Sequence, residues 1–162
     1  MQQYVSELRE AVDKAAPQLL SLRDTGKPRG PEADSWSRAE ILGHLIDSAT
    51  NNHRRFVIGQ LEDNLVFPGY QQNGWVSVQR YAEAPWDDLV TLWASYNRHL
   101  ARVMEAVPEE ARMKKYQMHS FDKIAWKPVD EAEATTLDYL MKDYVDHLKN
   151  HLNQLLGADW EK

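Results

Sequence analysis

Apolar residues recur every three or four positions in four separate stretches of the chain, which is the spacing of one face of an α-helix. The first stretch predicts an amphipathic helix from about residue 3 to residue 23. Its apolar positions are Val5, Leu8, Val12, Ala15, Ala16, Leu19 and Leu22. A segment rich in Gly, Pro and charged residues, DTGKPRGPEAD at 24–34, then breaks the pattern.

The second helix has a clear start signal. Ser37 and Glu40 form an S-x-x-E capping box, in which each side chain can accept a hydrogen bond from the backbone N–H of the other residue. The apolar stripe that follows predicts a helix to about Gly59. Its members are Ile41, Leu45, Ala49 and Phe56.

Proline and glycine mark the limits of the third and fourth helices. Pro85 suits the first position of a helix, where an N–H is not needed, and Pro108 is a stop signal. The fourth helix should start at Thr135 or Thr136 and end at the C-cap Gly157. The two apolar stripes are Trp86, Leu89, Trp93, Leu100 and Val107, and Leu137, Leu140, Tyr144, Leu148, Leu152 and Leu155.

Four helices of about 20 residues, without the sustained alternation of a sheet, predict an all-α protein, a four-helix bundle in one domain spanning 1–162. Two connecting segments, 61–82 and 109–134, are longer than ordinary loops. They should either cover a functional site or contain small elements of their own, and a short strand is predicted at 116–121. Most of the six tryptophans fall at helix starts or on apolar stripes, which predicts core positions.

Composition narrows the chemistry. The formal net charge of −6 argues against a nucleic-acid partner, because such proteins depend on clustered Lys and Arg. The chain has no cysteine, so a transition-metal site would have to use His and carboxylates. The N-terminal segment has no apolar run of signal-peptide or membrane-spanning length, which predicts no membrane association and a cytoplasmic location.

Histidines form the strongest candidate site. His147 and His151 are four residues apart on the predicted fourth helix, so both can reach one ion. The alternative is a pair of partly exposed histidines on an ordinary helix. His44, within the second helix, is a third candidate, because three neutral nitrogens bind Zn²⁺ or Ni²⁺ and leave a coordination position open. His44 lies about 140° from the centre of its helix's apolar stripe, on a polar line that fits either a cleft wall or a solvated face.

Three sequence segments resemble the DinB-like family: WSRAEILGHLIDSATNNHRRF, FPGYQQNGWV and DYVDHLKNHLNQLL, within residues 36–156. The resemblance implies a four-helix bundle with one His on the second helix and an HxxxH pair on the fourth, which together bind one divalent metal ion, Zn or Ni. The matching positions here are His44, His147 and His151.

Several polar and aromatic residues are candidates for substrate contact. In the first long connection, Tyr70 and Trp75, with Gln72 and Asn73 between them, could cover the open coordination position or could only seal the end of the bundle. On the polar line of His44, Ser48 and Asn51 could contact a ligand or could be solvated helix residues.

Asp143 lies one turn before His147 and could orient its imidazole, although a surface aspartate is the simpler interpretation. The remaining histidines, His53, His99 and His119, have no partner at ligand spacing and are expected to lie outside the site.

The resemblance implies a metal-dependent enzyme that acts on a small molecule, either a hydrolase or an S-transferase that uses a low-molecular-weight thiol such as bacillithiol, mycothiol or glutathione. The sequence does not select between them, because no Glu stands in an HExxH position and no Arg-rich thiol pocket is evident. The competing interpretation is a non-enzymatic homodimer that holds a small ligand or partner protein, with or without a metal.

Overall fold

The computed structural model describes residues 2–26 and 36–162, and within them it is helical without a strand. Four long helices form the bundle: α1 (Gln3–Leu20), α2 (Arg38–Ile58), α4 (Trp86–Ala106) and α7 (Leu137–Leu156). The predicted all-α four-helix bundle is therefore confirmed. Most of the predicted break at 24–34 lies outside the described residues.

The end signals of the helices act as predicted in two cases. Ser37 Oγ accepts from the backbone N–H of Glu40 at 3.2 Å, and Glu40 Oε2 accepts from the N–H of Ser37 at 2.7 Å. Thr136 Oγ1 accepts from the N–H of Tyr139 at 3.1 Å, and Gly157, with φ of 93°, ends α7. The predicted limits hold less well elsewhere. The first helix ends at Leu20 rather than near residue 23, and Pro85 precedes α4 instead of being its first residue.

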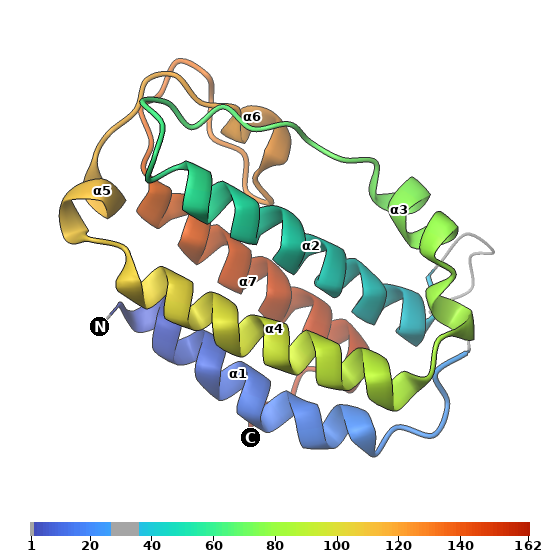
Figure 1. Cartoon of the computed structure of the whole chain (residues 1–162). Helices are drawn as coiled ribbons and strands as arrows, with labels where there is room; N and C mark the ends of the chain where they lie inside the picture. The colour runs from blue at the N-terminus through green and yellow to red at the C-terminus, as the bar shows by residue number, and fades with distance from the viewer. Residues whose placement is uncertain (1, 27–35) are drawn as a thin grey trace.

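The order of the helices around the bundle differs from their order in the sequence. Helices α1 and α2 each pack against both α4 and α7, so that α1 and α2 lie diagonally opposite. Helices α1 and α7 run in one direction, and α2 and α4 run in the other (Figure 1). Because α2 and α4 are parallel, the chain must return along the whole length of the bundle between them, which is about 30 Å for a helix of this length.

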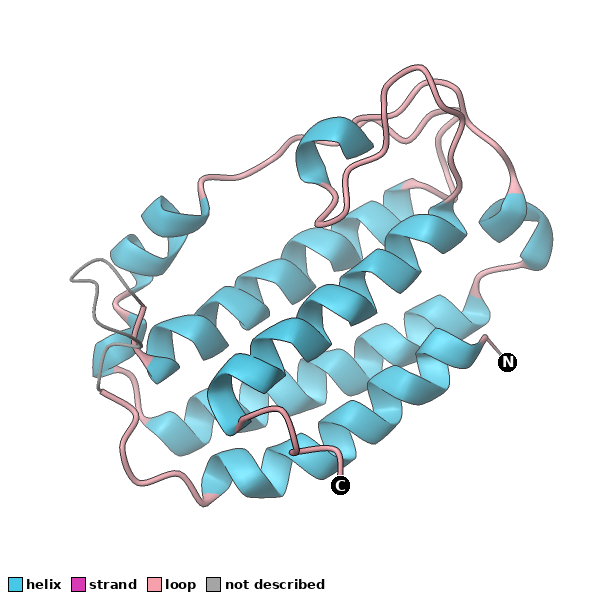
Figure 2. Ribbon diagram, turned by 180° about the vertical axis from the view of Figure 1, so that it is seen from behind, coloured by secondary structure: helices cyan, strands magenta, loops and turns pink. Residues whose placement is uncertain are grey.

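The two long connections carry short helices and pass over the outside of the bundle (Figures 1 and 2). The first contains α3 (Gln72–Gln79) and the 3₁₀ helix η1 (Tyr81–Glu83), and the second contains α5 (Glu109–Met113) and α6 (Phe121–Ile124). The strand predicted at 116–121 is wrong. Only isolated bridges form in the described residues, Leu65 with His119 and Tyr116 with Thr135.

The apolar stripes predicted from the sequence form the core, which is centred on side chains such as Leu8, Trp93 and Leu148. The tryptophans divide, because Trp93 and Trp160 are buried whereas Trp75 and Trp126 are exposed by 38% and 42%. None of the described helices combines the length and apolar character needed to cross a membrane.

Gly43 lets η1 pack directly on α2. A Cβ at this position would lie 2.1 Å from the ring of Tyr81, closer than any real contact. The Tyr81 hydroxyl donates to Asp47 Oδ1 at 2.6 Å, and Gln79 Nε2 donates to the same oxygen at 2.8 Å. The returning connection is thereby fixed to α2 beside His44.

We predict that Gly43→Ala destabilises the protein by about 1–3 kcal/mol, because the Tyr81 ring must move and overpacking exceeds the helix-propensity gain of about 1 kcal/mol. Gly74→Ala is the matched control, since a Cβ there meets Gln71 only at an ordinary 3.6 Å. Urea unfolding of both variants measures the difference. Equal stability of the two variants would contradict the close packing of Tyr81.

Candidate metal centre

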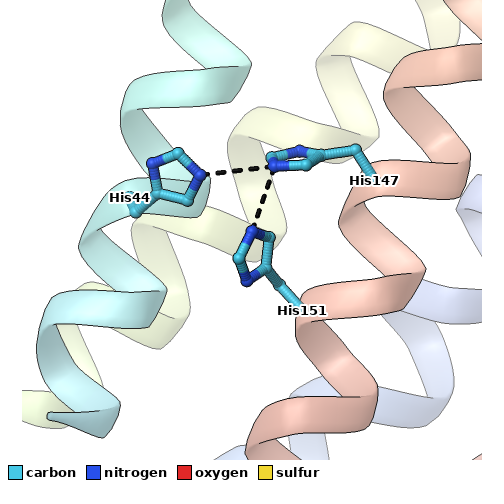
Figure 3. Close-up of side chains that lie close together, drawn as sticks. All are labelled: His44, His147 and His151. Carbon is cyan, nitrogen blue, oxygen red and sulfur yellow. Dashed lines mark hydrogen bonds between the residues drawn. The ribbon is translucent and has the colours of Figure 1, made fainter. Parts of the chain in front are cut away.

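Three imidazoles from two helices converge between α2 and α7 (Figure 3). His147 Nε2 lies 3.3 Å from Nε2 of His44 and 3.0 Å from Nε2 of His151. One ligand nitrogen of each residue lies within 4.8 Å of the others. The antiparallel packing of α2 against α7 brings His44 to the histidine pair, which the four-residue spacing places on one side of α7.

The donor set fits a divalent transition-metal ion. Nitrogen atoms at about 2.0–2.1 Å from a tetrahedral zinc ion are separated by about 3.3 Å, close to the distances found here. One Nε2 carries at most one proton or one lone pair, so His147 Nε2 cannot form two full hydrogen bonds with two other Nε2 atoms. The convergence is therefore better explained by a shared ion than by hydrogen bonding.

Burial keeps two of these imidazoles neutral. His44 is only 1% exposed, and desolvation, with a smaller contribution from the charge of His151, lowers its pKa to about 4. Desolvation and the two neighbouring histidines lower the pKa of His147 to about 3. Neutral imidazoles are the form that binds metal, so both residues are ready ligands at neutral pH.

Neighbouring side chains hold the rings. His151 Nδ1 lies 2.9 Å from Oε1 of Gln154, an acceptor, which favours a proton on Nδ1 and leaves Nε2 available. The ring of Trp36 packs on His44 with centroids 4.8 Å apart, and the ring of Trp126 lies 6.0 Å from His147. His44 is thus at the wall of a covered cleft rather than on a solvated face.

A cavity of about 130 Å³ adjoins His147. Of the four predicted substrate-contact residues, Ser48 and Tyr70 line it. Asn51 does not line it, and its amide donates to the backbone oxygen of Asp47 at 2.9 Å. Trp75 also lies outside the lining, but its ring packs on that of Tyr70 with centroids 5.1 Å apart.

Asp143 has a different position from either sequence interpretation. It is buried, not a surface residue, and burial raises its pKa. Its two oxygens accept from the backbone N–H groups of Trp126 at 2.8 Å and Lys127 at 2.9 Å, and it makes no hydrogen bond to a histidine. Asp143 therefore anchors the connection that places Trp126 beside His147.

Sequence reasoning missed several residues that line the cavity. Asn52 contributes from α2 and was not considered, and Arg55, which lies on the polar line of His44 in the sequence, was not proposed as a contact. Gln72, one of the amide groups considered as a possible cover, contributes from α3. Residues 44, 48, 52 and 55 follow one helical face, so periodicity counted from His44, which places Arg55 on this face, could also have identified Asn52.

The other histidines lie apart from this three-histidine cluster, as expected. His53 Nδ1 lies 2.8 Å from the Tyr96 hydroxyl, and its ring packs on that of His99. His119 Nε2 lies 2.8 Å from the backbone oxygen of Glu133. Among the described residues, His44, His147 and His151 form the one cluster suited to holding a metal.

Two solved structures share this fold. YfiT from Bacillus subtilis, described as a probable metal-dependent hydrolase with an unusual four-helix bundle topology, matches with a TM-score of 0.75 and 15% identity over 96% of this chain and 86% of that one. A mycothiol-dependent maleylpyruvate isomerase matches with a TM-score of 0.68 and 14% identity over 97% of this chain but only 60% of the isomerase chain.

No curated protein matches the chain in sequence. The family model of the DinB superfamily, in contrast, matches residues 3–155. This range contains the three histidines and all four long helices, except for the last residue of α7. The chain therefore belongs to the DinB superfamily.

Proposed function

We propose that the protein is a metal-dependent hydrolase of a small molecule, with one Zn²⁺ or Ni²⁺ ion bound by His44, His147 and His151. The observation that carries the proposal is the convergence of three Nε2 atoms at 3.0 and 3.3 Å beside a cavity. Three neutral nitrogen ligands leave a coordination position open, and a metal ion so bound supplies a water of lowered pKa for hydrolysis.

The cavity supports a compact substrate. At about 130 Å³ it is close to the size of cavities that bind benzene, and much too small to enclose bacillithiol, mycothiol or glutathione. Thiol S-transfer is therefore the less supported reaction, although a thiol could still approach from outside the cavity.

Two predicted contact residues are retained in the proposal. Ser48 and Tyr70 line the cavity and would bind the substrate. Burial, with the charge of Asp47, raises the pKa of the Tyr70 hydroxyl to about 12, so it stays protonated and can donate a hydrogen bond. The cytoplasmic location and the homodimer remain predictions from the sequence.

Metal analysis of protein purified without a His tag tests the site. We expect about one equivalent of Zn or Ni, and loss of the metal in His147→Ala because two imidazoles hold the ion too weakly. His53→Ala is the matched control, a histidine on α2 outside the cluster, and should keep the metal. Retention of metal by His147→Ala would remove the proposed site.

Metal dependence of hydrolysis is the second test. A panel of small esters, amides and lactones should be hydrolysed by the metal-loaded protein, and at least about 100-fold more slowly after chelation, because the activated water is lost. An unchanged melting temperature after chelation would accompany a catalytic ion, whereas a large fall would indicate a structural one. Metal-loaded protein that is inactive in this panel but active with thiol and an electrophile would favour S-transfer instead.

Stability of the metal-free protein should depend on pH through His44 and His147. Their native pKa values, about 4 and about 3, lie below the value of about 6.5 for an unfolded histidine. The unfolded chain therefore binds more protons between pH 6.5 and pH 4, and stability falls as the pH falls through this window.

The measurement is thermal unfolding in chelator, with the His44→Gln/His147→Gln variant as the reference that keeps all carboxylates. Relative to this variant, the wild type should lose on the order of 5 kcal/mol between pH 6.5 and pH 4, because a difference of one pKa unit corresponds to about 1.4 kcal/mol for each histidine. Parallel curves for the two proteins would show that the imidazoles are not held in their neutral form.

A further inference from the structure

Arg55 is a buried cation without a buried anion. The residue is 5% exposed, and no carboxylate of the described residues lies within ion-pair distance of it. Burying a charge is costly unless it is paired, and arginines are therefore seldom buried in this way. The position of Arg55 thus requires a second explanation beyond packing.

The existing contacts of Arg55 leave most of its hydrogen-bonding capacity unused. Nη1 donates to Asn52 Oδ1 at 3.4 Å, and Nη2 donates to the backbone oxygen of Pro68 at 3.2 Å. Both contacts are long and both acceptors are neutral. A guanidinium has five N–H donors arranged to match a carboxylate, so a compact anion could be bound without displacing either contact.

Among the described residues, the lining of the cavity offers Arg55 no free carboxylate. Lys123 also lines the cavity, but its exposed ammonium is paired with Asp122 at 3.8 Å, and the one carboxylate in the described lining, Asp143, accepts from the backbone N–H groups of Trp126 and Lys127. The Tyr70 hydroxyl lines the same cavity and makes no hydrogen bond within the described residues. The unused N–H groups of Arg55 and the Tyr70 hydroxyl therefore remain available to an anion, and Arg55 is the one cation of the described lining that no carboxylate pairs.

The cavity connects Arg55 with the metal centre. Ser48, Asn52 and Arg55 lie along one face of α2, and the cavity they line is also lined by His147. Arg55 lies seven positions after Ser48 on the helix, which corresponds to about 10 Å along the axis. A small extended molecule held at the Arg55 end would therefore reach the histidine end.

We propose that Arg55 binds the carboxylate of the substrate, so that the enzyme acts on small carboxylic acids whose reactive group lies at the other end of the molecule, toward His147. The position of the reactive group depends on the proposed hydrolase function, whereas the carboxylate subsite does not. The Tyr70 hydroxyl completes the subsite as a hydrogen-bond donor to the bound anion, and Asn52 positions Arg55 by accepting from its Nη1.

NMR titration of the protein with butyrate tests the subsite. Butyrate has six heavy atoms and suits the cavity of about 130 Å³, and butyramide is its uncharged isostere. The readout is the Nε–Hε signal of Arg55, assigned by its absence from the spectrum of Arg55→Gln. The titration is made on metal-free protein, where butyrate cannot bind to a metal ion, and repeated on zinc-loaded protein.

Butyrate should shift the Arg55 signal in both forms, and butyramide should not. Arg55→Gln should weaken butyrate binding at least about tenfold, because charge-assisted hydrogen bonds are lost. In this variant, binding is measured from the signals of the other cavity residues. Arg54→Gln is the matched control: the same change of charge at the neighbouring, exposed position of α2, which should leave binding unchanged.

Two results would overturn the proposal. If the Arg55 signal of the wild-type protein does not respond to butyrate, Arg55 is only an anchor for Pro68; this result does not depend on whether the variant folds. Equal responses to butyrate and butyramide would show an apolar pocket. Butyrate binding at Arg55 without any metal-dependent hydrolysis would support the carboxylate subsite and contradict the hydrolase function. Metal-dependent hydrolysis without butyrate binding at Arg55 would support the hydrolase function and contradict the subsite.

Discussion

The parallel direction of α2 and α4 is the constraint on which the rest of the structure depends. The chain leaves α2 at one end of the bundle and must begin α4 at the other, so residues 59–85 return along the outside. This return brings Tyr70 and Gln72 over the face between α2 and α7, where the second long connection meets them. A helix face that would be solvated in a simple up-and-down bundle becomes the wall of a covered pocket. The length of the first connection is thus a consequence of the topology, and the pocket is a consequence of the connection.

Because the connections cover the polar face of α2, polar side chains on this face are buried without a full set of hydrogen-bonding partners. His44, Ser48, Asn52 and Arg55 are all buried, although polar groups are stabilising inside a protein only when they are paired. Asn52 bonds within its own helix, but one nitrogen of His44 has no partner among the described residues, and Arg55 has only neutral acceptors. A chain selected for stability alone would place apolar residues here. Departures of this kind concentrate at functional sites, where ligands supply the missing partners.

The sequence predicts the helices well because their signals are local. Capping by Ser37 and Thr136 and the four apolar stripes depend on neighbouring residues, and they are found where expected. The HxxxH pair is also local, since one helix fixes it. The burial of side chains by segments that are distant in the sequence was less predictable. The helical wheel placed His44 away from the apolar stripe, which is correct, but it could not show that the connections bury that side. For the same reason it favoured Asn51 over Asn52. The surface interpretation of Asp143 likewise took no account of the connection that buries this residue.

The ligand set and the cavity favour the same sign of charge in a substrate. Nδ1 of His151 lies 2.9 Å from the neutral amide of Gln154, and Asp143, the one carboxylate among the described residues that line the cavity, is committed to backbone N–H groups. Three neutral imidazoles would leave the charge of a divalent ion uncompensated, which strengthens its effect on a bound water. Arg55 adds a further positive charge at the other end of the cavity. With a metal ion bound, the cavity would lie between two cationic centres, and such an arrangement would favour a short anion over a cationic ligand.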